Sequence, residues 1–233
     1  MELKELGQDL WDIAYERGGN ICFYPHEEIV RFTNKYIRKR KSVNEFENIM
    51  PISEDDWKSF ASLDLGCGIG RHVMFLDEFG LNPYGIDLSD EAITMGKEWF
   101  SSIGKSQLAE RLIVGSVTEL PFADNYFEMC VSHGVLDSMP REVAIKGIEE
   151  THRVLKPGAL MYVDLIMDTS KGDKDETVDF GYEKDTIQSY FTVKSIKLLL
   201  EKYFEILEFK IIYWTDENGN EKNKRAHLII QNR

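Results

Sequence analysis

The strongest structural signal in this sequence is the stretch Leu63-Asp64-Leu65-Gly66-Cys67-Gly68-Ile69-Gly70. An apolar run ends here in three glycines at alternate positions, and an amphipathic segment begins at Arg71. This order predicts a strand, a tight loop and a helix. Glycine has no Cβ, so a ligand can lie directly against the main chain, and the first N–H groups of the helix would point at it. We therefore expect a ligand-binding loop.

The spacing of these glycines differs from the dinucleotide fingerprint G-x-G-x-x-G, because Gly70 follows Gly68 after one residue. Three further stretches follow in order: Asp87 at the end of an apolar run, LPFADNYFE at 120–128, and RVLKPG at 153–158. Together they resemble the motifs D-x-G-x-G-x-G, LPF-x-D-x-x-FD and RVLKPGG of the class I S-adenosylmethionine-dependent methyltransferases. The resemblance runs from about Leu63 to the C-terminus and is weak before it.

The resemblance implies S-adenosyl-L-methionine as the cofactor and S-adenosyl-L-homocysteine as the product. Asp64 would lie near the amino group of the cofactor, Asp87 would hold the ribose, and Leu88 would lie against the adenine. Ser116 stands where the family frequently has an acid, and its uncharged hydroxyl is a weaker acceptor. The full cofactor-binding set implied is Asp64, Gly66, Cys67, Gly68, Gly70, Asp87, Leu88, Ser116, Val117 and His133.

Composition narrows the classes of partner. The chain has 233 residues, which suits one α/β domain with a modest addition, and its formal net charge of −13 disfavours a nucleic-acid partner. Its three cysteines lack C-x-x-C spacing, so we expect neither disulfides nor a metal site. The start has no signal-peptide pattern, and no apolar run is long enough to span a membrane. We therefore expect a cytoplasmic protein without a membrane partner, as a monomer or homodimer.

From Arg71 onward, strands and helices alternate, which indicates a parallel sheet with crossover helices. Two last apolar runs, 204–213 and 225–231, flank an Asn-Gly pair and predict an antiparallel hairpin. The predicted fold is therefore a doubly wound, Rossmann-like α/β domain over 58–233. It would have seven mostly parallel strands and this C-terminal hairpin. The polar stretch 168–185 predicts a long loop of the kind that forms lids.

Residues 1–57 carry helical patterns with many aromatic residues and no strand pattern. We expect an N-terminal helical cap. Trp11, Tyr15 and their aromatic neighbours would either cover the acceptor pocket or anchor the helices to the core, and both roles are compatible with the pattern.

Transfer of a methyl group from a sulfonium mainly requires alignment, with a base only where the acceptor holds its proton tightly. Three residues are candidates for that catalytic role: His133 and Asp137 in the loop after the fourth strand, and His26 in the cap. Alternatively, only the backbone at His133 matters. We expect His72 on the outer part of its helix, with His152 and His227 far from the pocket. Arg71 would either meet the cofactor or substrate, or lie in solvent.

Three functions are consistent with these residues. A methyltransferase acting on a small molecule is favoured by the motif order and the acidic charge. A methyltransferase acting on protein or nucleic acid is less favoured, because no N/D-P-P-Y tetrapeptide follows the fourth strand. A protein that binds the cofactor without transferring its methyl group is the third.

Overall fold

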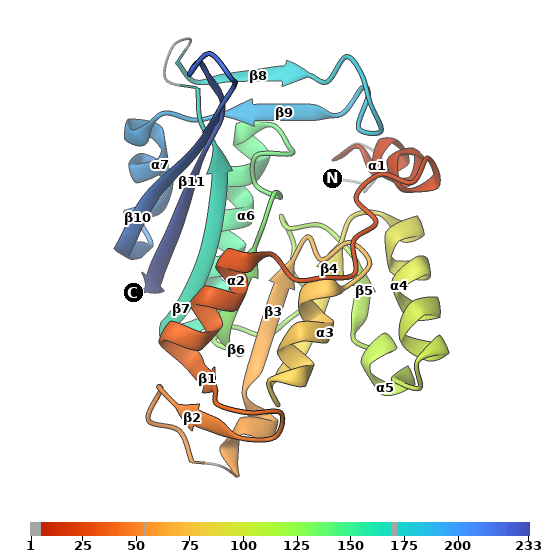
Figure 1. The fold of residues 1–233 in the computed structure, drawn as a ribbon, viewed down its shortest axis with the longest axis vertical. Coiled ribbons are helices and arrows are strands. Elements are labelled where there is room, and N and C mark those ends of the chain that lie inside the picture. The colour runs from red at the N-terminus through yellow and green to blue at the C-terminus, as the bar shows by residue number, and fades with distance from the viewer. Residues whose placement is uncertain (1–5, 54, 169–171) are drawn as a thin grey trace.

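A computed structural model describes residues 6–53, 55–168 and 172–233 (Figure 1). Its centre is a seven-stranded sheet in the order β10-β11-β7-β6-β3-β4-β5. The strands are β3 (Ala61–Leu65), β4 (Asn82–Asp87), β5 (Leu112–Val114), β6 (Phe127–Ser132), β7 (Leu155–Ile166), β10 (Phe204–Thr215) and β11 (Glu221–Asn232). The strands β3 to β7 run parallel, while β11 pairs antiparallel with β7 and with β10. This confirms the predicted fold and its C-terminal hairpin.

Helices cover both faces of the sheet. They are α3 (Arg71–Glu78), α4 (Asp90–Ser102), α5 (Ser106–Ala109), α6 (Arg141–Val154) and α7 (Val193–Leu200). On one face, Ile148 of α6 and Ile196 of α7 pack on buried strand residues such as Cys130. On the other, Phe75 of α3 packs near Met129, the neighbour of Cys130 in β6. Adjacent strand residues thus face opposite cores, as expected for a central parallel sheet.

Local sequence explains where two of these helices begin. Ser89 caps α4 by accepting a hydrogen bond from the N–H of Ala92 at 3.1 Å. Thr192 caps α7 in a capping box with Ser195. Such caps satisfy backbone donors that have no partner within the helix. No helix in the described ranges is long and apolar enough to cross a membrane.

The strand order places the ligand loops at one edge. Strand β3 has β4 on one side and β6 on the other, so the crossover direction reverses at β3. Loops that leave the carboxyl ends of the two strands beside such a switch point diverge and leave a crevice. The glycine stretch after β3 and the His133 loop after β6 therefore border the same space.

The N-terminal segment is not purely helical. Helix α1 (Gln8–Glu16) lies at the carboxyl edge, whereas α2 (Glu27–Phe32) and η2 (Thr33–Ile37) run down the sheet (Figure 1). They lead to a hairpin, β1 (Arg38–Arg40) with β2 (Phe46–Asn48), at the opposite end, followed by η3 (Asp56–Ser59). The expectation of helices without strands was wrong for these two short strands. Their charged residues gave no apolar alternation; Arg38 instead stacks its guanidinium 4.4 Å from the Phe46 ring.

The expected loop at 168–185 also contains a strand. Strand β8 (Lys174–Thr177) pairs with β9 (Ile187–Tyr190) to form an arm above the carboxyl edge (Figure 1). Residues 169–171 of the expected loop lie outside the described residues. The tip of the arm meets the end of α1, where the Asn20 amide donates to the Glu183 carboxylate at 2.7 Å. Strand β8 contains only polar residues, so the alternation of apolar and polar residues that marks a strand is absent from its sequence.

Candidate functional site

A cavity of about 340 Å³ lies at the carboxyl ends of β3, β4, β5 and β6. This volume is within the range of small-molecule sites. Of the expected cofactor-binding set, Gly66, Cys67, Gly68, Asp87, Leu88, Ser116, Val117 and His133 line it. Two members, Asp64 and Gly70, are not among its lining residues.

The glycine stretch forms one wall of this cavity. Gly66 and Gly68 both have positive φ, at 68° and 55°. A Cβ on Gly66 would lie 2.4 Å from a Val135 methyl, and one on Gly68 would lie 2.5 Å from the Tyr15 hydroxyl. A Cβ on Gly70 would meet the Phe100 ring of α4 at 2.8 Å. Gly70 therefore allows Phe100 to pack against the start of α3, while Gly66 and Gly68 allow Val135 and Tyr15 to lie against the loop.

Asp87 lies at the end of β4 with its carboxylate in the cavity wall. It accepts hydrogen bonds from the N–H groups of Gly68 at 2.7 Å and Ser89 at 2.9 Å. Burial raises its pKa to about 6, although those two N–H groups favour the charged form. Asp87 thereby fixes the glycine loop and remains ionised at neutral pH.

The other end of the cofactor wall is formed by Leu88, Ser116 and Val117. Leu88 and Val117 are apolar surfaces suited to a flat ring. The Ser116 hydroxyl lies 2.8 Å from the Thr118 hydroxyl and accepts the Thr118 N–H at 3.1 Å. It is thus already engaged in a local turn.

Asp64 and His72 form a buried pair behind the glycine loop. The His72 Nδ1 lies 3.4 Å from one Asp64 oxygen, and the other Asp64 oxygen has no hydrogen-bond partner among the described residues. His72 is 3% exposed and lines the cavity, so the expectation that it lies on the outer part of its helix was wrong. Residues 72 to 76 of α3 are all buried, because the helix is covered on more than one side.

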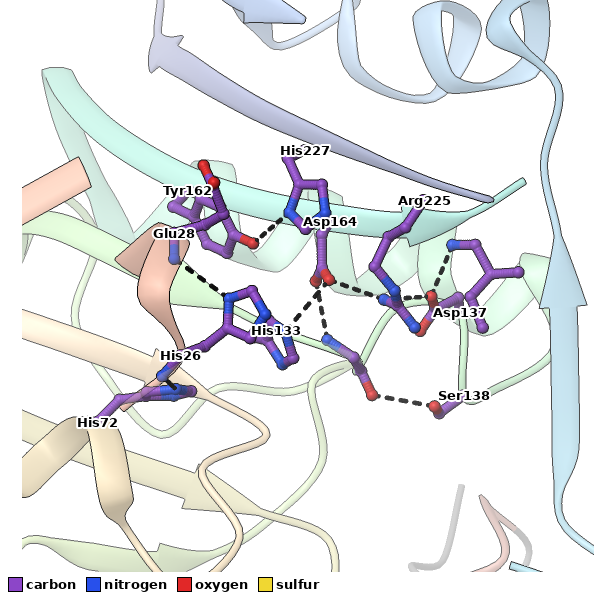
Figure 2. A network of polar contacts seen from close by, with 12 residues as sticks. His26, Glu28, His72, His133, Asp137, Ser138, Tyr162, Asp164, Arg225 and His227 are labelled. Atoms are coloured by element: carbon purple, nitrogen blue, oxygen red, sulfur yellow. Dashed lines mark hydrogen bonds and ion pairs between the residues drawn. The ribbon is translucent and has the colours of Figure 1, made fainter. Parts of the chain in front are cut away.

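Four histidines come together beside this pair (Figure 2). The His133 ring lies 3.9 Å from the His26 ring, centroid to centroid, and the His227 ring lies 6.0 Å beyond His26. His72 accepts the His26 N–H at 3.3 Å. The expectation that His227 lies far from the pocket was therefore wrong, because β11 folds back beside β7. His152 does lie elsewhere, with its ring against Tyr203.

His133 is held at both ring nitrogens. Its Nε2 lies 3.6 Å from the Asp164 carboxylate, and its Nδ1 lies 3.3 Å from Arg71 Nη2. Burial lowers the pKa of His133 to about 3; Asp164 opposes this shift, and the neighbouring His26, His72 and Arg71 side chains add to it. Burial likewise lowers the pKa of His26. Both rings are thus neutral at physiological pH.

Behind His133 lies a buried ion cluster (Figure 2). Arg225 of β11 contacts both Asp137 and Asp164 at 2.8 Å. Asp137 also accepts the Ile166 N–H at 2.7 Å, and burial raises its pKa to about 6. Burial alone would raise the pKa of Asp164, but Arg225 and His133 outweigh it and hold it below its usual range. Asp137 is fully buried and is not a lining residue of the cavity.

Several lining residues lie outside the expected cofactor-binding and catalytic sets, although Trp11 and Tyr15 were expected to cover the pocket or to anchor the cap. Helix α1 supplies Trp11 and Tyr15, and it is fastened by Asp12, which accepts the Ser89 hydroxyl at 2.7 Å. The others come from the segment after α1, from the β8–β9 arm and from β11: Asn20, Cys22, Glu183, Gln188 and Arg225. None belongs to a sequence motif. In the described parts of the chain, no group of three or more His, Cys, Asp or Glu side chains could hold a metal ion.

These residues fit S-adenosylmethionine. Gly66 and Gly68 line the cavity with bare main chain, so a ligand can lie directly against the loop there. The Asp87 carboxylate can accept hydrogen bonds from ribose hydroxyls, and Leu88 and Val117 can contact a base. The buried Asp64 oxygen without a partner is an acceptor next to the same loop.

Comparison with known proteins identifies the family. Residues 63–163 match the model of the methyltransferase domain. A sterol 4-C-methyltransferase of Caenorhabditis elegans is 30% identical over 48% of this chain, which spans only 33% of that protein's length. A demethylmenaquinone methyltransferase of Geobacillus stearothermophilus is 28% identical over 83% of this chain and 74% of its own.

A solved structure agrees with these matches. The S-adenosylmethionine-dependent methyltransferase of Methanosarcina mazei superimposes with a TM-score of 0.61 at 26% identity, covering 74% of this chain and 92% of its own. The cofactor of this fold and of this glycine loop is S-adenosylmethionine. Residues 63–163 of this chain therefore form a methyltransferase domain, and the chain has the fold of the S-adenosylmethionine-dependent methyltransferases.

Proposed function

We propose that this protein is a methyltransferase that transfers the methyl group of S-adenosylmethionine to a small-molecule acceptor. One observation carries the proposal: a single cavity joins the Asp87 end to the His133 end. Helix α1 and the tip of the β8–β9 arm border it, and the Asn20–Glu183 hydrogen bond links the two. A concave site of this size, bordered by these two segments, suits a small acceptor better than a macromolecule. Two relatives are named for small acceptors, a sterol and demethylmenaquinone.

The residues divide the work as follows. Asp87 binds the ribose, while the main chain at Gly66 and Gly68 orients the cofactor. When bound, S-adenosylmethionine would supply a methyl group that its sulfonium activates. The acceptor would attack the methyl carbon in line with the carbon–sulfur bond, and the sulfur would be the leaving group. His133 contacts the acceptor. His26 and Asp137 are positioning residues: the His26 ring packs against the His133 ring, and Asp137 forms an ion pair with Arg225.

The net charge and the cysteines support two further assignments, the class of acceptor and the cellular location. The net charge of −13 argues against nucleic acid as the acceptor. All three cysteines are free, which suits the reducing cytoplasm. We place the protein there, as a monomer or a homodimer.

Label transfer tests this proposal. The protein would be incubated with methyl-labelled S-adenosylmethionine and an extract of its native cells, separated into small-molecule, protein and nucleic-acid fractions. We expect label in the small-molecule fraction, and none with Asp87→Ala. Label in a macromolecular fraction would instead support a protein or nucleic-acid methyltransferase. Cofactor binding without transfer to any fraction would make the protein a non-catalytic binder.

A further inference from the structure

Arg71 is a cation in the cavity wall without an acidic partner. It is the first residue of α3 and lines the cavity. Its guanidinium lies 3.3 Å from the His133 Nδ1, and it also contacts the Cys22 thiol. In the ranges 6–53, 55–168 and 172–233, no carboxylate forms an ion pair with Arg71. Its charge is thus available to a ligand.

The second arginine of the cavity wall is different. Arg225 is neutralised by Asp137 and Asp164, each at 2.8 Å. Of the acids that line the cavity, Asp87 is held by two backbone N–H groups at the ribose end, and Glu183 accepts from Asn20 at the arm. At the His133 end of the cavity, Arg71 is therefore the lining cation that forms no ion pair within the described residues.

His133 is badly placed to remove a proton from a neutral acceptor. Because Asp164 is a charged acceptor, the ring proton belongs on Nε2, which faces it. The lone pair on Nδ1 then faces a guanidinium N–H of Arg71. A general base needs a free lone pair within hydrogen-bond reach of the proton it accepts. The lowered pKa of His133 agrees with this geometry.

We propose that the acceptor binds as an anion, with its negative charge on or next to the atom that is methylated, and that Arg71 is the residue that selects it. This inference rests on the proposed function. The matching chemical classes are phenolates, enolates, carboxylates and thiolates. The acceptor lone pair forms the bond to the methyl carbon, and the electrons of the carbon–sulfur bond return to sulfur. Anion and sulfonium become two neutral groups at the reacting atoms, so no proton has to be removed.

One other anion could reach Arg71, namely the carboxylate of the cofactor's own methionine part. The two sources are separable because 5′-methylthioadenosine lacks the amino-acid part of S-adenosylhomocysteine. If Arg71 held the cofactor carboxylate, Arg71→Met would weaken S-adenosylhomocysteine and leave 5′-methylthioadenosine unchanged. If Arg71 serves the acceptor, neither affinity changes by more than about twofold.

Calorimetry on the S-adenosylhomocysteine complex tests the proposal. Three matched pairs serve as probes: 4-nitrophenolate with 4-nitroanisole, benzoate with benzamide, and acetate with acetamide. In at least one pair, we expect the anion to bind at least about tenfold more tightly, as one charge-assisted hydrogen bond allows. Arg71→Met should abolish that preference, and Arg71→Lys should retain part of it. Arg17→Met, which removes an exposed arginine at the end of α1, should retain it in full.

Three results would overturn the inference. No anion might be preferred in any pair, the preference might survive in Arg71→Met, or Arg71→Met might weaken S-adenosylhomocysteine alone. Failure of the wild-type protein to bind S-adenosylhomocysteine is a separate result, which would remove the proposed function and this inference with it.

Discussion

The two ends of the cavity are built differently. At the cofactor end, the lining residues Gly66, Asp87 and Ser116 each lie at or just after the end of a strand of the parallel sheet, within about fifty residues of sequence. At the acceptor end, the side chains come from distant segments: Cys22, Arg71, His133, Gln188 and Arg225. The first end is specified by backbone geometry, the second by tertiary packing. Substitutions at the cofactor end should therefore have larger and more uniform effects on ligand affinity than substitutions at the acceptor end have on the rate of methyl transfer.

The largest effect is expected from Gly66→Ala. The added Cβ would lie 2.4 Å from Val135 on a backbone with φ of 68°. Strain of this kind costs on the order of 1–3 kcal/mol, so S-adenosylhomocysteine affinity should fall roughly tenfold to a hundredfold. Calorimetry would measure it.

Gly158→Ala is the matched control, because Gly158 has φ of 82° but nothing within 4 Å of the added Cβ. It should leave the affinity unchanged. Adding Val135→Ala to Gly66→Ala should recover part of the loss by relieving the clash. Full affinity in Gly66→Ala would mean that the glycine loop does not carry the cofactor.

Asp87→Ala should weaken S-adenosylmethionine and S-adenosylhomocysteine by more than tenfold. The ribose hydroxyls would lose a charged acceptor, at a cost of roughly 1.5–3 kcal/mol per hydrogen bond. Asp90→Ala, which removes an exposed acid three residues later, should bind normally. Equal affinities in titrations of the two variants would remove Asp87 from the site.

The affinity should also depend on pH through the same carboxylate. Because the pKa of Asp87 is about 6, the ionised form that accepts hydrogen bonds is lost as the pH falls from 7 to 5. S-adenosylhomocysteine should then bind about tenfold more weakly at pH 5. Asp87→Asn, which cannot titrate, should show a flat profile. A wild-type profile as flat as that of Asp87→Asn would contradict this assignment.

His133→Gln tests the acceptor end. If His133 only orients the acceptor, turnover should fall by less than about tenfold, whereas loss of a general base typically costs ~10²–10⁴-fold. Asp164, His26, His72 and Arg71 surround the ring, and its pKa of about 3 keeps it neutral. The rate at which labelled product forms should thus show no change between pH 5 and 8 that arises from titration of His133.

His26→Gln is the companion variant, because the His26 ring packs against His133 without lining the cavity. It should change the rate even less. A limb near neutral pH that disappears in either variant would identify that histidine as the base after all.

The smallest effect is expected at the Asn20–Glu183 hydrogen bond, which is exposed. Such a bond contributes only ~0.5–1.5 kcal/mol, so Asn20→Ala should alter cofactor affinity by a few-fold at most.

Hydrogen exchange should show that cofactor and acceptor together slow exchange in 6–26 and 178–186. Equal protection with and without ligands would mean that these segments form an ordinary packed layer.

This contrast also explains how much the sequence could predict. The spacing of Gly66, Gly68 and Gly70 alone indicated a ligand-binding loop, and the resemblance to a known family implied that Asp87 would hold the ribose. Arg225 lies inside an ordinary-looking strand, and only the pairing of β11 with β7 brings it to Asp164. His227 reaches the cluster in the same way.

The periodicity of apolar residues did not predict the burial of His72 or the strands β1 and β8, for a related reason. His72 was expected outside because a helix with one apolar stripe leaves the rest in solvent, but α3 is covered by the glycine loop, the sheet and α2. Strands β1 and β8 are short and charged, so no alternation marked them. Their positions depend on partners such as Phe46 and Ser189.

The most direct test is an experimental structure of the protein with S-adenosylhomocysteine. We predict one molecule per chain in the cavity, with its ribose hydroxyls on the Asp87 carboxylate, its adenine beside Leu88 and Val117, and its sulfur toward His133. A molecule bound outside the cavity, or in it with the adenine against His133, would contradict the account.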